Sequence, residues 1–282
     1  MLAAEPCIAE TLYFENEGSE LKRAVDLARL AALLRRNRFR TVCILDRNVR
    51  PALAALLAGV PQRIGLGLTA QRFFITNPGI DRSRYHDHPI DWLRALMAAM
   101  KVPLPSTEPD LQVAGGAIAA ISDRFRTCAR PWIVLGIGAA DPRRDWPDDY
   151  WAEFLNSSGE LFRGTIFLVG GPSNAARAQS LIERTNGIAA VNACDLQITE
   201  VLALLRHADL FVGPDSGPMN LAAAVGTATF GLFGVNRVLS YSKFIHPIAP
   251  QGGPGPDGMR HISPALVLEQ IKPHLIGEKL PM

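Results

Sequence analysis

Three short segments of the sequence contain residue types suited to binding a phosphate. The first, residues 213–222, follows an apolar run and has the sequence GPDSGPMNLA. Ser216 is placed to cap a helix, Pro218 fits the first helical turn, and Gly226 would end the helix. The free backbone N–H groups at a helix start attract a phosphate, and Gly217 would let the ligand approach the backbone closely. An ordinary well-capped helix is the alternative interpretation.

The second segment, residues 135–147, also joins an apolar run to a helical pattern. Its Arg143 and Arg144 could clamp a diphosphate through charge-assisted hydrogen bonds, although a solvated loop anchored by Trp146 explains the same residues. The third, residues 169–174, is another glycine turn after an apolar run. Ligands bind at the carboxyl ends of the strands in open parallel sheets. Taken together, the three segments predict a phosphate-containing ligand.

Carboxylates and histidines offer weaker signals. Asp215 would repel a phosphate, so it is expected to accept a hydrogen bond from a sugar hydroxyl or to brace the turn. His86 and His88 could act as a general base or as a pair of metal ligands. No third metal ligand follows at a recognisable spacing, so a role in helix capping or packing is favoured and no metal is expected. Asp46 and Arg50 could face an interdomain cleft or form a stabilising ion pair.

Helical and strand patterns alternate along the whole chain. Strands that are almost continuously apolar predict an α/β fold whose parallel sheet is covered on both faces. The expected helices are 21–36, 50–57, 91–100, 117–128, 148–162, 175–184, 198–207 and 218–225, and the expected strands are 41–45, 63–66, 132–135, 165–169, 210–212 and 229–233. The Pro-rich stretch after residue 102 and the length of 282 residues predict two domains, 1–128 and 129–282.

Composition narrows the class of protein. A formal charge of +2 is too small to make the whole chain a platform for nucleic acid, and 48% hydrophobic residues exclude global disorder. Four widely spaced cysteines and the lack of a signal-peptide pattern favour a reduced, cytoplasmic protein. No apolar run approaches the 20 or so residues that span a bilayer, so the chain is expected to be soluble.

Several motifs together resemble those of glycosyltransferase family nine, the ADP-heptose:lipopolysaccharide heptosyltransferases. Residues 215–224 (DSGPMNLAAA) are similar to the family's D-[ST]-G-P-x-H-L-A-A-A signature, which is followed here by Leu-Phe-Gly at 232–234. Weaker similarities cover nearly the whole chain: residues 46–50, 58–65, 88–93, 142–147 and 259–267.

The resemblance implies a GT-B-like fold, with two Rossmann-like domains whose parallel sheets face a cleft. The C-terminal domain would bind a nucleotide sugar, which the family name gives as ADP-linked, and the N-terminal domain would bind a lipopolysaccharide or other glycan or lipid-linked acceptor. Transfer would invert the anomeric carbon without a metal or cofactor. An acceptor at the inner membrane would add peripheral membrane contact through the basic residues Arg35, Arg36, Arg38 and Arg40.

Carried over by position, the resemblance assigns residues to both substrates. The donor-binding residues would be Gly138, Ala139, Arg143, Arg144, Gly171, Ser173, Asn174, Asp215, Ser216, Gly217, Pro218 and Asn220. The acceptor-side residues would be Asn48, Arg50 and His88.

The sequence also departs from the family pattern. Asn220 stands where the family has His, and Arg144 where it has Lys. The family's first β-α-β unit, whose Asp is thought to be the catalytic base, is expected to be missing, so the N-terminal domain would be incomplete and no base is assigned. The alternative function is therefore a non-catalytic nucleotide-sugar-binding or partner-binding relative.

Overall fold

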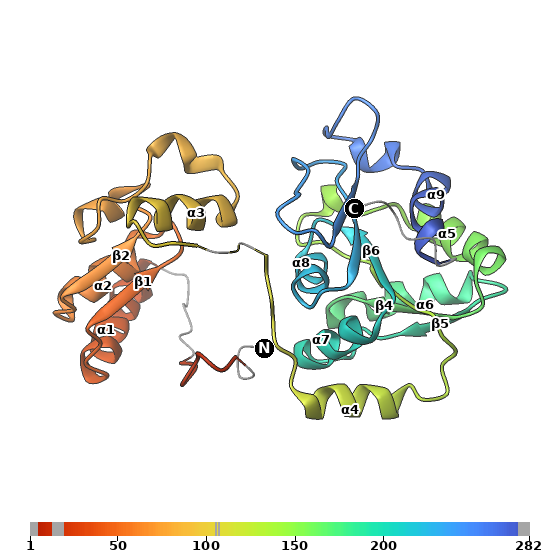
Figure 1. Ribbon diagram of the computed structural model, residues 1–282, viewed down its shortest axis with the longest axis horizontal. Coiled ribbons are helices and arrows are strands. Elements are labelled where there is room, and N and C mark those ends of the chain that lie inside the picture. Colours follow the sequence, from red (N-terminus) through yellow and green to blue (C-terminus); the bar gives the residue numbers. More distant parts are fainter. Residues whose placement is uncertain (1–4, 13–19, 105, 107, 276–282) are drawn as a thin grey trace. The chain divides into compact units, whose positions relative to one another are not determined.

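The computed structural model describes residues 5–12, 20–104, 106 and 108–275, which form two compact units (Figure 1). The N-terminal unit is Leu12–Thr107, and the C-terminal unit is Glu108–Met282 together with Met1–Thr11. The division lies earlier in the chain than the expected boundary at 128/129. The reason is helix α4 (Gly115–Arg124), whose Ile121 and the following Phe125 are buried in the core of the C-terminal unit.

The N-terminal unit contains a two-stranded parallel sheet and three helices among its described residues. Strands β1 (Thr41–Ile44) and β2 (Gln62–Gly65) pair in parallel, with Thr41 opposite Gln62. The helices are α1 (Glu20–Arg36), α2 (Val49–Leu57) and α3 (Pro89–Ala99). All of these elements were predicted from apolar spacing. A small core of Leu66, Leu68, Trp92 and Leu96 holds α3 against the chain that follows β2.

The C-terminal unit is built on a six-stranded parallel sheet with the order β5-β4-β3-β6-β7-β8. Its strands are β3 (Trp132–Gly136), β4 (Thr165–Val169), β5 (Ala189–Asn192), β6 (Leu210–Pro214), β7 (Ala228–Leu232) and β8 (Ile245–Ile248). The parallel sheet confirms the predicted fold class. The edge strands β5 and β8 were not predicted, because β5 is half-exposed and β8 contains Pro247, a residue that sheets accept at their edges.

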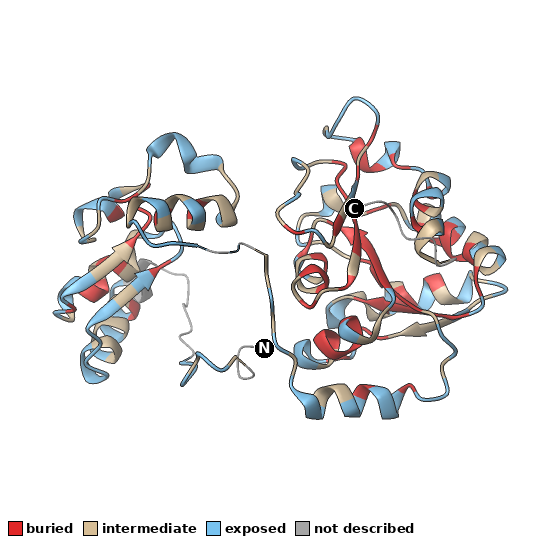
Figure 2. Cartoon of the chain, viewed as in Figure 1, coloured by how far each residue is buried: buried red, intermediate tan, exposed pale blue. Residues whose placement is uncertain are grey.

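Helices cover both faces of this sheet, as its apolar strands require. On one face, Ile133 and Leu135 pack among side chains of α5 (Asp148–Leu161), α6 (Ala175–Glu183) and α9 (Pro264–Leu275). On the other, Val134 packs among α4, α7 (Ile198–His207) and α8 (Gly217–Ala224). The four central strands, β4, β3, β6 and β7, are accordingly buried between two helical layers in Figure 2. Helix α9 was not predicted. Within the described ranges, no helix combines the length and apolarity needed to cross a membrane.

Candidate functional site

The predicted glycine loops lie at the carboxyl ends of three neighbouring strands, β4, β3 and β6. The side chain of Asn174, which follows β4, lies close to the loop that follows β3. Its Oδ1 accepts a hydrogen bond from the Gly171 amide at 3.1 Å. A Cβ on Gly138 would lie only 3.0 Å from the Asn174 side-chain nitrogen, which shows how closely the loop after β3 approaches the loop after β4.

Arg144 connects the loop after β3 to the loop after β6. Its Nη1 donates to the Asp215 carbonyl oxygen at 2.8 Å and lies 3.3 Å from the Asp215 carboxylate. The same carboxylate oxygen accepts a hydrogen bond from Asn236 Nδ2 at 2.7 Å. Both members of the ion pair are mostly buried, with 22% of the Arg144 side chain and 14% of the Asp215 side chain exposed. Asp215 therefore braces the turn, as one of its two predicted roles requires.

Ser216 and Gly217 form the start of helix α8. Ser216 occupies the N-cap position, as predicted, but its side chain makes no capping hydrogen bond. Its Oγ is buried and has no partner among the described residues, and the same holds for Arg144 Nε. A Cβ at Gly217 would meet nothing within 4 Å, so the backbone there is open to a ligand. Two unsatisfied buried polar groups next to a helix N-terminus suit an anion.

The loop after β3 is fixed by two residues outside the predicted donor-binding set. Asp145 Oδ1 accepts from the Ala139 amide at 2.7 Å. Arg177, from helix α6, donates to Asp145 Oδ2 at 3.0 Å and to Asp148 Oδ1 at 2.8 Å. Its guanidinium group also donates to the carbonyl oxygens of Ile137 and Trp146. An arginine in a helix gives no local signal of this role, because all its partners come from another segment.

Arg143 does not reach Asp215, although it is the neighbour of Arg144. Its guanidinium pairs with Asp141 at 2.7 Å, and 72% of its side chain is exposed. Hydrogen bonds from Arg143 lower the pKa of Asp141 to about 2, and the same pair raises the pKa of Arg143. Arg143 also lines a cavity of about 310 Å³ with Arg177 and Arg260.

The remaining predicted donor residues lie at the same sheet edge. Ser173 is exposed in a 3₁₀ turn, Pro172–Asn174, and Pro218 is in the first turn of α8. Asn220 Nδ2 donates to the Ser216 carbonyl oxygen at 2.8 Å, and Asn220 Oδ1 accepts from the Tyr241 hydroxyl. Tyr241 and Asn236 both come from the loop between β7 and β8, beyond the Leu-Phe-Gly match at 232–234.

The predicted acceptor-side residues have local structural roles in the N-terminal unit. Asn48 caps α2, accepting from the Arg50 amide at 3.0 Å, and His88 caps α3 through Nδ1. The Asp46 carboxylate accepts from the Asn48 amide at 2.7 Å. Among the described residues Asp46 and Arg50 do not form the ion pair that was one of the two expectations. Arg50 lines a cavity of about 220 Å³ together with Asp26 and Asp46. Their contact with an acceptor stays a prediction.

A metal centre was not expected from the sequence. In the part of the chain that the structure describes, no group of three or more His, Cys, Asp and Glu side chains is arranged to hold a metal ion.

The sheet order, the two-unit division and the loop cluster define an α/β protein of the GT-B-like class. The family model described as glycosyltransferase family 9 (heptosyltransferase) matches residues 27–251. The chain belongs to glycosyltransferase family 9.

Known proteins in this group are similar to the chain. The lipopolysaccharide core heptosyltransferase OpsX of Haemophilus influenzae is 22% identical over 219 residues, which cover 75% of this chain and 61% of that protein. The structure of E. coli ADP-heptose lps heptosyltransferase II superposes with a TM-score of 0.76 at 22% identity, covering 91% of this chain and 82% of that one. E. coli heptosyltransferase WaaC with ADP-2-deoxy-2-fluoro heptose gives a TM-score of 0.64 at 17% identity, covering 90% and 78%.

The matches fix the family and the fold. The chain spans less than two thirds of the length of its relative OpsX. The expected absence of the family's first β-α-β unit stays a prediction.

Proposed function

We propose that this protein is a heptosyltransferase-type glycosyltransferase whose C-terminal unit binds a nucleoside-diphosphate sugar. The observation that carries the proposal is the turn at Asp215 and Ser216. There, a helix N-terminus, a mostly buried arginine and two buried polar atoms without partners in the described structure lie together at the carboxyl edge of a parallel sheet. A diphosphate supplies the acceptor oxygens that Ser216 and Arg144 lack.

The reaction would transfer the sugar from the diphosphate to an acceptor hydroxyl with inversion. The carbon–oxygen bond to the diphosphate breaks as the acceptor oxygen attacks the anomeric carbon. Arg144 and the α8 N-terminus would stabilise the negative charge that develops on the leaving diphosphate. Asp215 Oδ2 is engaged by Arg144 and Asn236, so Oδ1 is the atom we assign to a sugar hydroxyl. We assign no residue as the base that removes the acceptor proton.

We base the particular donor and acceptor on the substrates that the names of the relatives give. ADP-heptose is proposed as the donor because the WaaC structure holds an ADP-heptose analogue, and a lipopolysaccharide acceptor because OpsX is named a lipopolysaccharide core enzyme. Asn48, Arg50 and His88 are proposed to face that acceptor. An acceptor at the inner membrane would place the exposed arginines at 35, 36, 38 and 40 near anionic lipid.

A nucleotide-sugar-binding relative without turnover is the second candidate. The observation that favours it concerns Asn220, which occupies the family's His position. Both polar atoms of its side chain are bonded within the protein, to Ser216 and Tyr241. The Asn220 side chain therefore already has hydrogen-bond partners in the protein before a substrate binds.

The experiment is calorimetric titration of the full chain with ADP, UDP and GDP, followed by a transfer assay with ADP-heptose. We expect ADP to bind best. Asp215→Ala should weaken the binding of ADP-heptose by about tenfold or more, because it removes the carboxylate that we assign to a sugar hydroxyl and leaves the mostly buried Arg144 without its partner. Asp195→Ala is the matched control, since Asp195 forms an exposed ion pair with Arg124 at 2.7 Å in the same unit. Equal affinity in both variants would contradict the site, and binding without transfer would favour the second candidate.

A further inference from the structure

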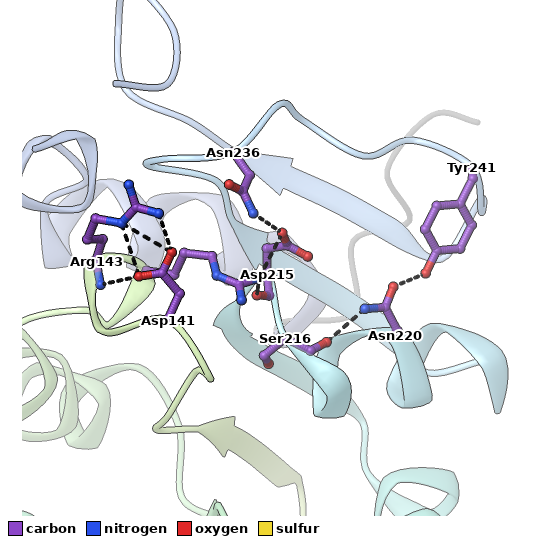
Figure 3. Close-up of polar contacts among 8 residues, drawn as sticks. Asp141, Arg143, Asp215, Ser216, Asn220, Asn236 and Tyr241 are labelled. Atoms are coloured by element: carbon purple, nitrogen blue, oxygen red, sulfur yellow. Dashed lines mark hydrogen bonds and ion pairs between the residues drawn. The ribbon is translucent and has the colours of Figure 1, made fainter. Parts of the chain in front are cut away.

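The loop between β7 and β8, residues 233–244, contacts the candidate site through two side chains. Asn236 donates to the Asp215 carboxylate, and the Tyr241 hydroxyl donates to Asn220 (Figure 3). Neither residue belongs to a motif that suggests ligand binding. The loop therefore determines how two elements of the site are held, the Asp215 turn and the first turn of helix α8.

The contact at Tyr241 continues to the helix N-terminus. By accepting from Tyr241, Asn220 Oδ1 fixes the orientation of the amide group, so that Nδ2 points at the Ser216 carbonyl oxygen at 2.8 Å. The Asn220 backbone amide donates to the same carbonyl at 3.2 Å. Burial first, and then the negative charges of Asp215 and Glu108, raise the pKa of Tyr241 to about 12. The hydroxyl hence remains protonated and able to donate at neutral pH.

The other end of the loop is fixed by Glu108, the first residue of the C-terminal unit after Thr107. The Glu108 carboxylate accepts from the Ser242 hydroxyl and from the Lys243 amide, the latter at 3.1 Å. Ser242 is buried, and its Oγ also accepts from the Phe244 amide at 3.1 Å. Tyr241 is thus adjacent to a fixed point in the backbone, which restricts the positions its hydroxyl can take.

We propose that Tyr241 is a positioning residue for the nucleotide sugar, holding the start of helix α8 through Asn220 on a loop that Glu108 anchors. This inference rests on the proposed function. It predicts that the Tyr241 hydroxyl affects binding of the phosphate end of the ligand. The hydroxyl would act through Asn220 and not by touching the phosphate itself.

The ring and the hydroxyl of Tyr241 have separable roles. The ring packs against the hydrophobic core on the α8 side of the sheet, as Val238 and Leu239 also do. Truncating the whole side chain would therefore disturb the fold as well as the hydrogen bond. Tyr241→Phe removes the hydroxyl alone. Tyr150→Phe is the matched control, because the Tyr150 hydroxyl donates to the Arg260 carbonyl oxygen at 3.1 Å in the same unit, away from Asn220.

The test is titration of the full-length variants with ADP and with adenosine, together with thermal unfolding. We expect Tyr241→Phe to weaken ADP binding by about fivefold, the effect of one hydrogen bond, while adenosine binding and the unfolding temperature stay close to those of the unmodified protein. Tyr150→Phe should leave ADP affinity unchanged. Glu108→Gln, which weakens the anchor without removing the hydroxyl, should give a smaller loss of ADP affinity in the same direction.

A double-mutant cycle separates positioning from general loosening of the fold. If Tyr241 acts through Asn220, the effects of Tyr241→Phe and Asn220→Ala on ADP affinity are not additive, whereas those of Tyr150→Phe and Asn220→Ala are. Additive effects in the first pair would overturn the inference. So would equal ADP affinity in Tyr241→Phe and the unmodified protein, with the proposed function left intact. If the unmodified protein binds none of ADP, UDP and GDP, the proposed function itself fails.

Discussion

At the scale of single residues, two histidines in the C-terminal unit have an unfavourable environment for charge. The His246 ring stacks on Phe230 with 5.0 Å between centroids, and the His274 ring lies 5.0 Å from the His246 ring. His274 Nδ1 is buried without a partner in the described structure. Burial lowers the pKa of both residues, and for His246 the proximity of His274 lowers it further.

These shifts predict how stability depends on pH. Both rings are harder to protonate in the folded state than in the unfolded chain. The stability that they contribute is therefore fully present above about pH 6.5, and it is lost as the pH falls from that value toward the folded-state pKa. Urea unfolding at pH 7.5 and pH 5.5 should show lower stability at pH 5.5. His246→Phe, which keeps the stacked ring, should reduce the pH dependence, whereas the exposed His261→Asn should not. An undiminished pH dependence in His246→Phe would contradict this explanation.

Arg177 shows how one side chain determines the geometry of a loop. Lysine would keep its charge but lose the planar group that reaches Asp145, Asp148 and two carbonyl oxygens. We expect Arg177→Lys to lower the free energy of unfolding by about 2 kcal/mol and to weaken ADP binding. The exposed Arg124→Lys should cost less than about 1 kcal/mol. Equal denaturation midpoints for the two variants would argue against a special role for Arg177.

At the scale of elements, two glycines at the edge of the sheet differ in what surrounds them. Gly217 starts helix α8 and has open space around it, whereas a Cβ at Gly234, just after β7, would lie 2.3 Å from the Met259 backbone nitrogen. We expect Gly217→Ala to keep the unfolding temperature and weaken ADP binding, because the added methyl group occupies the approach to the helix N-terminus. Gly234→Ala should destabilise the fold by about 3 kcal/mol. Unchanged ADP affinity in Gly217→Ala would remove this backbone from the site.

At the scale of the whole molecule, the described residues that we assign to the donor all lie in the C-terminal unit. This unit has two apolar cores, one on each side of its six-stranded sheet. A fragment of residues 108–282 should therefore fold alone, with a cooperative thermal transition, and bind ADP with an affinity close to that of the full chain. It should not transfer sugar, because the predicted acceptor residues are absent. A fragment that is unfolded by circular dichroism would show that the unit depends on the remaining chain.

Features that depend only on neighbouring residues could be predicted from the amino-acid sequence. Apolar runs bounded by glycines located β3, β4 and β6, helical spacing located α5, α6 and α7, and the 215–224 motif indicated the family. These signals are local, because a buried strand and a capped helix start need particular residues within one short segment.

Contacts between distant segments became evident only in the folded protein. The fold gives the two neighbouring arginines different partners: Arg144 reaches Asp215, whereas Arg143 pairs with Asp141. It also brought Arg177, Asn236 and Tyr241 to the site from segments without a motif, and it assigned α4 to the C-terminal unit. The physical reason is that these contacts depend on the order of strands in the sheet and on the paths of the loops between them. A sequence pattern specifies the direction of a side chain within its own element, and the partner across the sheet is set by packing.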